Sequence, residues 1–123
     1  MAAELTPGSA TREQALAAFR AEGCGAPRSW ANGPADRYAR HRHDEHKVLF
    51  CLGGSIVFHT DAGDLELTEG DRLDLPEGSL HAASVGPDGC ECVEAYRAGP
   101  VERSLDGTRE RSLDKHDQER PVR

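Results

Sequence analysis

The chain has 123 residues and a formal net charge of −7 at pH 7, a length that fits one small domain and excludes two independent cores. Its apolar residues are unevenly distributed, because 14 of the 21 Leu, Ile, Val and Phe residues lie between positions 48 and 95. We therefore predict one ordered core with polar flanks. The apolar segments are far too short to span a membrane.

The acidic charge is concentrated in the same part of the chain. Residues 41–95 contain three Lys or Arg and twelve Asp or Glu, so this region would repel nucleic acid and anionic lipid surfaces. We therefore expect neither nucleic acid nor a membrane as a partner. No apolar segment follows Met1, so we expect no secretory signal, a cytoplasmic protein, and four reduced cysteines rather than disulfides.

The first predicted element is a short helix. The first ten residues have no periodic pattern, and we expect no regular structure there. Thr11 and Gln14 form a capping box, apolar residues follow at helical spacing, and Gly23 supplies the stop. The pattern predicts a helix over about residues 11–22, within an N-terminal extension of residues 1–29.

From residue 41 onwards the pattern changes to short strands separated by turns rich in Gly, Pro and Asp. The predicted strands are 47–52, 55–60, 65–68, 72–75, 81–85 and 90–97, so the glycines at 53 and 54 and the segment 87–89 are predicted turns. Strands in succession without intervening helices predict an all-β sandwich or barrel. Residues 99–123 are rich in charge, and we expect a polar tail that is disordered or forms a surface helix over 109–119.

Two groups of residues can carry chemistry. His41 and His43 are separated by one residue, and on a strand such residues share a face with their Cα atoms roughly 6.6 Å apart, close enough to hold one metal ion. The alternative is a pair of solvated surface histidines. His81 follows a turn built from Pro76 and Gly78, and alone it would be more simply a buried core histidine.

Together these motifs resemble those of the cupin superfamily, specifically its small single-domain members. The second cupin motif, G-x5-P-x-G-x2-H, is matched by Gly70, Pro76, Gly78 and His81, and the first by His41, His43 and Gly54. The resemblance implies a double-stranded β-helix, a jelly-roll barrel over residues 30–98. It also implies that the three histidines converge on one divalent metal ion (Fe, Mn, Ni or Zn) inside the barrel.

The chain departs from the cupin pattern at the position that usually supplies a fourth ligand. Lys47 stands there, and a protonated amine has no lone pair to offer a cation. Three arrangements of a metal site stay open: the three histidines alone, His46 as a fourth ligand through a β-bulge, or Glu45 on the face of His41. A barrel without a functional metal is the remaining alternative.

Lys47 and Glu94 are candidate catalytic residues, each with two interpretations. Lys47 is either a rim lysine paired with Asp44 or Glu66, which we favour, or a cavity lysine that holds a substrate carboxylate or enolate beside the metal. Glu94 faces inward if the cysteines two and four residues before it do, and there it could act as a general base. We favour the other alternation, which leaves Glu94 in solvent.

The function that this resemblance implies is that of a metal cupin acting on a small organic molecule, with dioxygenase-like or isomerase- or lyase-like chemistry. The alternatives are a non-catalytic cupin that binds or senses a small molecule, and a structural dimer that has lost its metal. The barrel leaves strand edges that a second copy can pair with, so we expect a homodimer.

Overall fold

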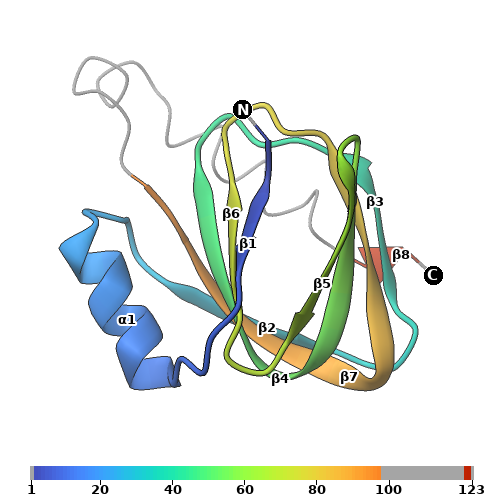
Figure 1. Cartoon of the computed structure of the whole chain (residues 1–123), viewed down its shortest axis with the longest axis horizontal. Coiled ribbons are helices and arrows are strands. Elements are labelled where there is room, and N and C mark those ends of the chain that lie inside the picture. The colour runs from blue at the N-terminus through green and yellow to red at the C-terminus, as the bar shows by residue number, and fades with distance from the viewer. Residues whose placement is uncertain (1, 98–120, 123) are drawn as a thin grey trace.

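The computed structural model describes residues 2–97 and 121–122, and residues 1, 98–120 and 123 lie outside this description. Figure 1 shows a β-barrel with one helix at its side. The elements are β1 (Glu4–Thr6), α1 (Arg12–Ala21), β2 (Arg28–Asn32), β3 (Arg37–His41), β4 (Lys47–Thr60), β5 (Gly63–Thr68), β6 (Arg72–Leu75), β7 (His81–Tyr96) and β8 (Pro121–Val122). The prediction of an all-β fold with a short N-terminal helix is confirmed. The predicted tail and its possible helix over 109–119 fall almost entirely outside the described residues.

Two long antiparallel strands, β4 and β7, form the frame of the barrel. They pair with each other along almost their whole lengths, while β6 and β5 pair with the first and second halves of β4. On the other side of β7, the strands β2 and β3 pair with its second and first halves. Each long strand therefore contributes to both halves of the barrel.

The predicted turns at 53–54 and 87–89 are wrong, because both segments are bends within continuous strands. The pairing of β4 with β7 shifts register between Cys51 and Gly53 and again between Gly54 and Ile56. Gly54 has φ +66°, and a Cβ atom there would lie 2.0 Å from the carbonyl oxygen of Gly89. The two bends approach so closely that only glycine fits, which made them look like hairpin turns in the sequence.

We expect Gly54→Ala to destabilise the barrel by roughly 3 kcal/mol or more, because the substitution adds both a positive-φ penalty and a backbone clash. The matched control is Gly53→Ala, whose Cβ would meet nothing closer than 3.9 Å and whose cost should stay near 1 kcal/mol. Urea unfolding of the two variants measures the difference. Equal losses of stability would contradict the assigned role of the bend.

The expectation of an irregular N-terminus is also wrong. Residues 4–6 form β1, which pairs antiparallel with β6. The segment after β1 crosses the turn at Gly70, where a Cβ atom would lie 2.5 Å from Ser9 Cα, and the amide of Ala10 donates a hydrogen bond to the Gly70 carbonyl. A three-residue strand is too short to produce a periodic pattern, so only this long-range pairing defines it.

Helix α1 gives the sheet a second buried face. Its N-terminus has the predicted capping box between Thr11 and Gln14. Its buried side chains, Ala15 and Phe19, belong to an outer core cluster with residues of β4 and β7, and the Phe19 ring meets Phe50 edge-on with centroids 5.6 Å apart. The barrel interior holds a separate cluster. Consequently residues 92–95, near the C-terminal end of β7, are buried on both faces of the sheet.

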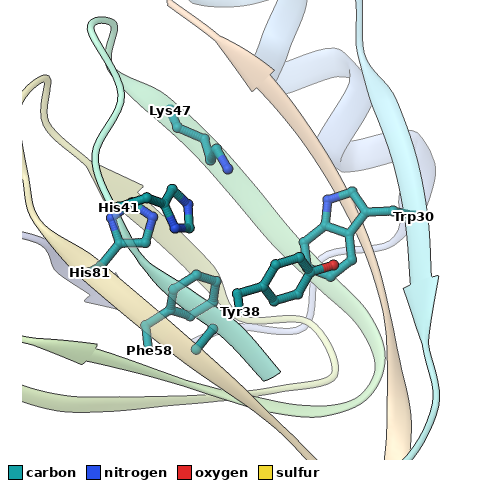
Figure 2. Close-up of a pocket in the computed structure, with 7 residues that line it drawn as sticks. Trp30, Tyr38, His41, Lys47, Phe58 and His81 are labelled. Atoms are coloured by element: carbon teal, nitrogen blue, oxygen red, sulfur yellow. The ribbon is translucent and has the colours of Figure 1, made fainter. Parts of the chain in front are cut away.

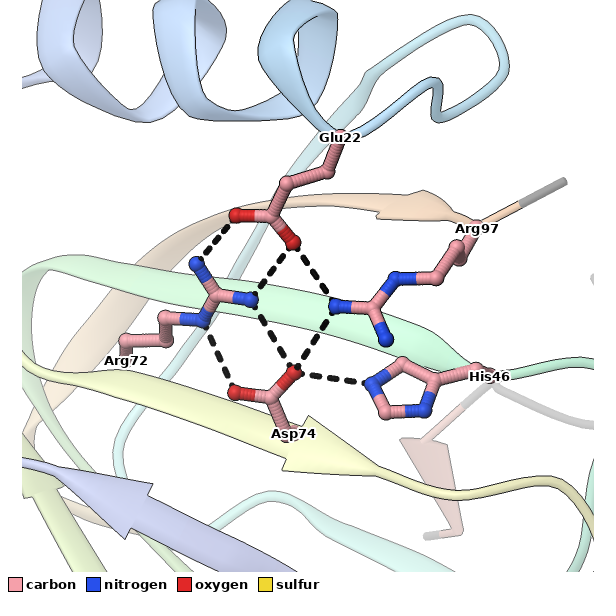
Figure 3. A network of polar contacts seen from close by, with 5 residues as sticks. All are labelled: Glu22, His46, Arg72, Asp74 and Arg97. Atoms are coloured by element: carbon pink, nitrogen blue, oxygen red, sulfur yellow. Dashed lines mark hydrogen bonds and ion pairs between the residues drawn. The ribbon is translucent and has the colours of Figure 1, made fainter.

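A network of charged side chains fastens the C-terminal end of α1 to the sheet (Figure 3). Glu22 accepts two hydrogen bonds from Arg72, at 2.7 and 2.8 Å, and one from Arg97 at 2.8 Å. Asp74 accepts from Arg72 at 2.8 Å and contacts His46 Nε2 at 2.8 Å. These cations hold the pKa of Glu22 at about 2, below its usual 4.5.

A lowered carboxyl pKa means that Glu22 stabilises the fold fully above about pH 4.5 and loses this contribution as the pH falls toward 2. We expect Glu22→Gln to cost about 2 kcal/mol at pH 7, since the group is partly solvated, and progressively less in acid. Urea titrations at pH 7 and pH 3 test this expectation. Glu66→Gln, at an exposed residue of β5, is the control, and a pH-independent cost for Glu22→Gln would contradict the argument.

Candidate metal centre

Three histidines from distant parts of the chain meet at one end of the barrel. His41 is the last residue of β3, His43 follows in the connection to β4, and His81 opens β7 opposite His41 in the register. Their ligand nitrogens all lie within 4.8 Å of one another. His43 and His81 are only 3% and 1% exposed, so the cluster is a buried site and not a pair of surface histidines.

The Nδ1 atom of each histidine ring contacts a neighbouring protein group, which leaves Nε2 as the candidate ligand atom. The Nδ1 atoms of His41 and His81 lie 2.6 and 3.0 Å from the carbonyl oxygens of Ala39 and Ser79. Because a carbonyl can only accept, Nδ1 is the protonated nitrogen in both rings, and Nε2 of a neutral ring carries the lone pair. The Nδ1 atom of His43 lies 3.3 Å from the Tyr96 hydroxyl.

Burial also fixes the protonation state of His81. Desolvation, followed by the nearby His41 and Lys47 charges, lowers the pKa of His81 to about 3. The ring is therefore neutral at physiological pH, which is the form that binds metals. Its Nε2 atom is buried and makes no hydrogen bond within the described residues.

This donor set fits a divalent metal ion. Three neutral imidazoles are ligands for Zn, Fe, Ni or Mn, with typical metal–nitrogen distances of about 2.0–2.1 Å for zinc. A buried lone pair that no protein donor satisfies is costly unless something else binds it. Among the described residues, no other group of three or more His, Cys, Asp or Glu side chains is arranged to hold an ion.

A small cavity lies beside the histidines (Figure 2). It is lined by Trp30, Tyr38, His41, Lys47, Phe58, His81 and Ala83. About 10 Å³ of it is open to the centre of a water molecule, which is room for roughly one water. Apolar and aromatic walls with a few polar groups at one end are typical of a small-molecule site.

Lys47 projects into this cavity, and the favoured prediction of a rim lysine is wrong. Its side chain is 3% exposed, and its Nζ atom lies 3.2 Å from Oε1 of Glu94, which is 1% exposed. The Lys47 ammonium also lies over the Tyr96 ring, 5.7 Å from its centroid. A lysine is present here because a buried carboxylate balances its charge.

Glu94 faces the barrel interior, so the favoured prediction that it lies in solvent is also wrong. Oε1 accepts a hydrogen bond from Trp30 Nε1 at 2.8 Å, and Oε2 lies 3.6 Å from an Arg28 nitrogen. The sequence could not decide which side chains face inward, because both faces of this part of β7 are buried. Cys92 and Glu94 face the barrel interior, while Val93 and Ala95 pack against α1. Period-two reasoning assumes one solvated face.

His46 and Glu45 lie outside the cluster of ligand nitrogens. His46 points to the outer face, where its Nε2 atom contacts Asp74 (Figure 3). Residues 42–46 form the connection between β3 and β4, and this connection directs the His43 and His46 side chains to different sites. Of the arrangements left open by the sequence, the described geometry brings together the three histidines alone.

Three aromatic residues of the site were not predicted as functional. Phe58 and Tyr96 stand in the predicted strands 55–60 and 90–97, and Trp30 stands at the start of the predicted barrel. Trp30 orients Glu94, Tyr96 contacts His43, and Phe58 lines the cavity. The one available signal was that Trp30, the single tryptophan of the chain, stands in an otherwise polar segment.

The barrel, the motif spacing and the clustered histidines define a member of the cupin superfamily, as the sequence predicts. More specifically, residues 28–112 match the AraC-like ligand binding domain family. This match covers more than half of the chain, which therefore belongs to that family. Among the described residues, no helix is long and apolar enough to cross a membrane.

Similar proteins agree on the fold. A cupin-2 domain protein from Shewanella frigidimarina superposes with a TM-score of 0.52 at 15% identity, covering 58% of this chain and 69% of that one. Acireductone dioxygenase from Bacillus anthracis, with a cadmium ion in its active centre, gives 0.55 at 16% identity over 70% and 58%. Quercetin 2,3-dioxygenase from Bacillus subtilis is 33% identical over 54 residues, 42% of this chain and only 16% of that protein.

Proposed function

We propose that this protein is a mononuclear metal cupin that binds a small oxygen-bearing organic molecule and acts on it in a dioxygenase-like reaction. His41, His43 and His81 would hold the ion. The observation that carries the proposal is the convergence of three buried imidazole nitrogens beside a cavity that also contains an ammonium group. The similarity to quercetin and acireductone dioxygenases supports this choice of reaction over isomerase or lyase chemistry.

The protein residues have distinct tasks in this proposal. A bound Fe, Mn or Ni ion would supply an electrophilic, redox-active centre with open positions, because only three protein ligands surround it. Lys47 presents a positive charge to the cavity and can hold an enolate or carboxylate oxygen. Glu94 keeps that charge balanced before the substrate enters, and Trp30 fixes the Glu94 carboxylate.

The size of the cavity restricts how a substrate can bind. Since it holds roughly one water, an organic ligand must displace aromatic side chains of its wall. Trp30 and Tyr38, whose rings meet edge-on with centroids 5.6 Å apart, form the part of the wall away from the histidines (Figure 2). We propose that their movement admits the ligand.

The test is oxygen uptake by protein loaded with Fe(II), Mn(II) or Ni(II), measured against 1,2-dicarbonyl, catechol-like and thiol compounds. We expect uptake with at least one compound class, none with the Zn(II)-loaded protein, and none with His81→Ala. Stoichiometric metal without turnover of any compound class would overturn the enzymatic proposal.

A non-catalytic ligand-binding role is the second candidate, and membership of the AraC-like ligand binding domain family favours it. In that case a small molecule would bind at the same cavity and change the fluorescence of Trp30, the single tryptophan, without being consumed. Saturable fluorescence change with full recovery of the compound distinguishes this role from catalysis.

We also propose that the protein is a homodimer. The strand order of the sheet runs from β1 at one end to β8 at the other, and the outer edge of a terminal strand such as β1 can pair with a second copy. Light scattering of the full chain tests this, and a monomeric mass at micromolar concentration would reject it.

A further inference from the structure

A second reactive group lies inside the barrel and has no part in the proposed metal chemistry. Cys51, Cys90 and Cys92 are all buried and all free thiols. They belong to the inner core cluster, next to the bends of β4 and β7, and the Cys92 side chain interacts with both other thiols. Three such thiols in one core are chemically unlike the aliphatic residues that could fill the same volume.

The backbone places Cys51 and Cys92 directly opposite each other on antiparallel strands. The amide of Cys51 donates to Asp71 O at 3.0 Å, and its carbonyl accepts from the amide of Gly70 at 2.7 Å. Both backbone groups of Cys51 therefore point away from β7, so Cys51 and Cys92 form a non-hydrogen-bonded pair. Residues in such pairs have Cα atoms about 4.5 Å apart, within the range of about 4.4–6.8 Å that a disulfide requires.

Cys90 is less suited to a disulfide with either partner. It shares a strand and a face with Cys92, so their Cα atoms are roughly 6.6–6.8 Å apart, at the upper limit for a disulfide, with nearly parallel Cβ directions. Its register partner on β4 is Gly54 and not Cys51. The geometry therefore selects one pair among the three thiols.

We propose that Cys51 and Cys92 are an oxidation site that forms a cross-strand disulfide with a small two-electron oxidant such as hydrogen peroxide. The Cys51 sulfur attacks one peroxide oxygen, the O–O bond breaks, and the other oxygen leaves as water after taking a proton. The Cys92 sulfur then displaces the remaining oxygen as a second water and forms the S–S bond. Overall two thiols lose two hydrogens and one peroxide becomes two waters.

The thiol environment assigns the order of these steps. The Cys92 thiol beside it lowers the pKa of Cys51, while both neighbouring thiols raise the pKa of Cys92. Within this pair we therefore expect Cys51 to react first as a thiolate and Cys92 to resolve the intermediate. Both thiols are fully buried, so we expect their reaction to be slower than oxidation of the partly exposed Cys24.

We expect oxidation of Cys51 and Cys92 to change the position of Trp30 in the wall of the cavity. Trp30 is the register partner of Cys92 on β2, and its indole donates to Glu94 and lines the cavity. Drawing β4 and β7 together at Cys92 shifts the strand that carries Trp30. The emission of this single tryptophan is therefore a second readout, independent of metal or turnover.

The experiment exposes the native full-length protein to hydrogen peroxide, blocks remaining thiols, and maps disulfides by mass spectrometry without reduction. We expect a linked Cys51–Cys92 peptide whose mass is about 2 Da below the sum of its two reduced peptides, because two thiol hydrogens are lost, and a shift in Trp30 emission that dithiothreitol reverses. Cys90→Ser should keep the linkage, and Cys92→Ser should abolish it.

The wild-type peptide map decides the proposal even if a variant fails to fold. A folded protein in which Cys51 and Cys92 stay reduced even after peroxide has oxidised Cys24 completely would overturn it. A linkage of Cys90 to Cys92, or a disulfide within the chain that persists in folded Cys92→Ser, would overturn it as well.

Discussion

The Glu94→Ala variant should lose roughly 3–5 kcal/mol of stability, the usual cost of removing one partner from a buried ion pair. Lys47 and Glu94 are almost fully buried, and Nζ lies 3.2 Å from Oε1. Without this carboxylate the ammonium stays in an apolar cavity, and Trp30 Nε1 loses its acceptor at 2.8 Å. Both losses act in the same direction.

Two comparisons separate this effect from a general cost of truncation. Glu91→Ala removes a carboxylate from the same strand whose partner, Arg12, lies 2.6 Å away at the exposed surface, and it should cost less than about 1 kcal/mol. The double variant Lys47→Met/Glu94→Leu removes both charges and should recover to within about 1–2 kcal/mol of wild type.

Urea unfolding at pH 7 measures all four proteins. If the Glu94→Ala and Glu91→Ala proteins unfolded at the same urea concentration, the two carboxylates would contribute equally to stability. That result would contradict the stabilising role assigned to the buried Lys47–Glu94 pair. A double variant less stable than Glu94→Ala would contradict the idea that an uncompensated charge causes the loss.

The second large effect concerns metal binding. We expect His81→Ala to weaken the binding of a divalent metal by roughly a hundredfold or more, because loss of a direct ligand should exceed the 10–100-fold effects of outer-shell partners. His81 contributes a buried Nε2 atom that makes no other hydrogen bond among the described residues. Its lowered pKa, about 3, keeps that atom available over the whole physiological range.

His59→Ala is the matched control for this variant. His59 is a partly exposed histidine of β4 whose ring contacts Asp64 and Ser84 at 2.9 and 2.8 Å, outside the metal site. Calorimetric titration with Ni(II) should give one site per chain in wild type and in His59→Ala, and a greatly weakened one in His81→Ala. Equal affinities in the two variants would place the binding site elsewhere.

The histidine cluster could be predicted in part from the sequence, because some of its members are marked by local signals. The glycine and proline residues around Gly70 and Pro76 fix turns, and the close spacing of His41 and His43 brings their rings together, although His43 lies just beyond the end of β3. Such turns are decided by backbone conformation that only a few residue types adopt. The family resemblance then related His81 to the other two histidines, which no local pattern can do.

The environment of the cluster could not be predicted in the same way. Val93 and Ala95 are apolar because α1 covers the outer face of the sheet, and this tertiary contact leaves Glu94 on the inner face. The same holds for Lys47, whose burial requires the carboxylate of a strand far along the chain. Period-two patterns carry no information about charges that neutralise each other across the barrel.

The bends of the long strands show a different limit. Gly54 and Gly89 have the composition of hairpin turns, and both do adopt positive φ. What distinguishes a bend from a turn is the pairing of β4 with β7 on both sides of it. That pairing joins residues tens of positions apart, so a short sequence window predicts the backbone conformation correctly and the topology wrongly.

The most direct test of the metal centre is an anomalous diffraction map of crystals of the protein loaded with Fe, Mn, Ni or Zn. We expect one strong peak about 2.0–2.2 Å from the Nε2 atoms of His41, His43 and His81 together. Full loading with a peak at any other group of side chains, or no ordered peak while the three rings keep their positions, would contradict the account.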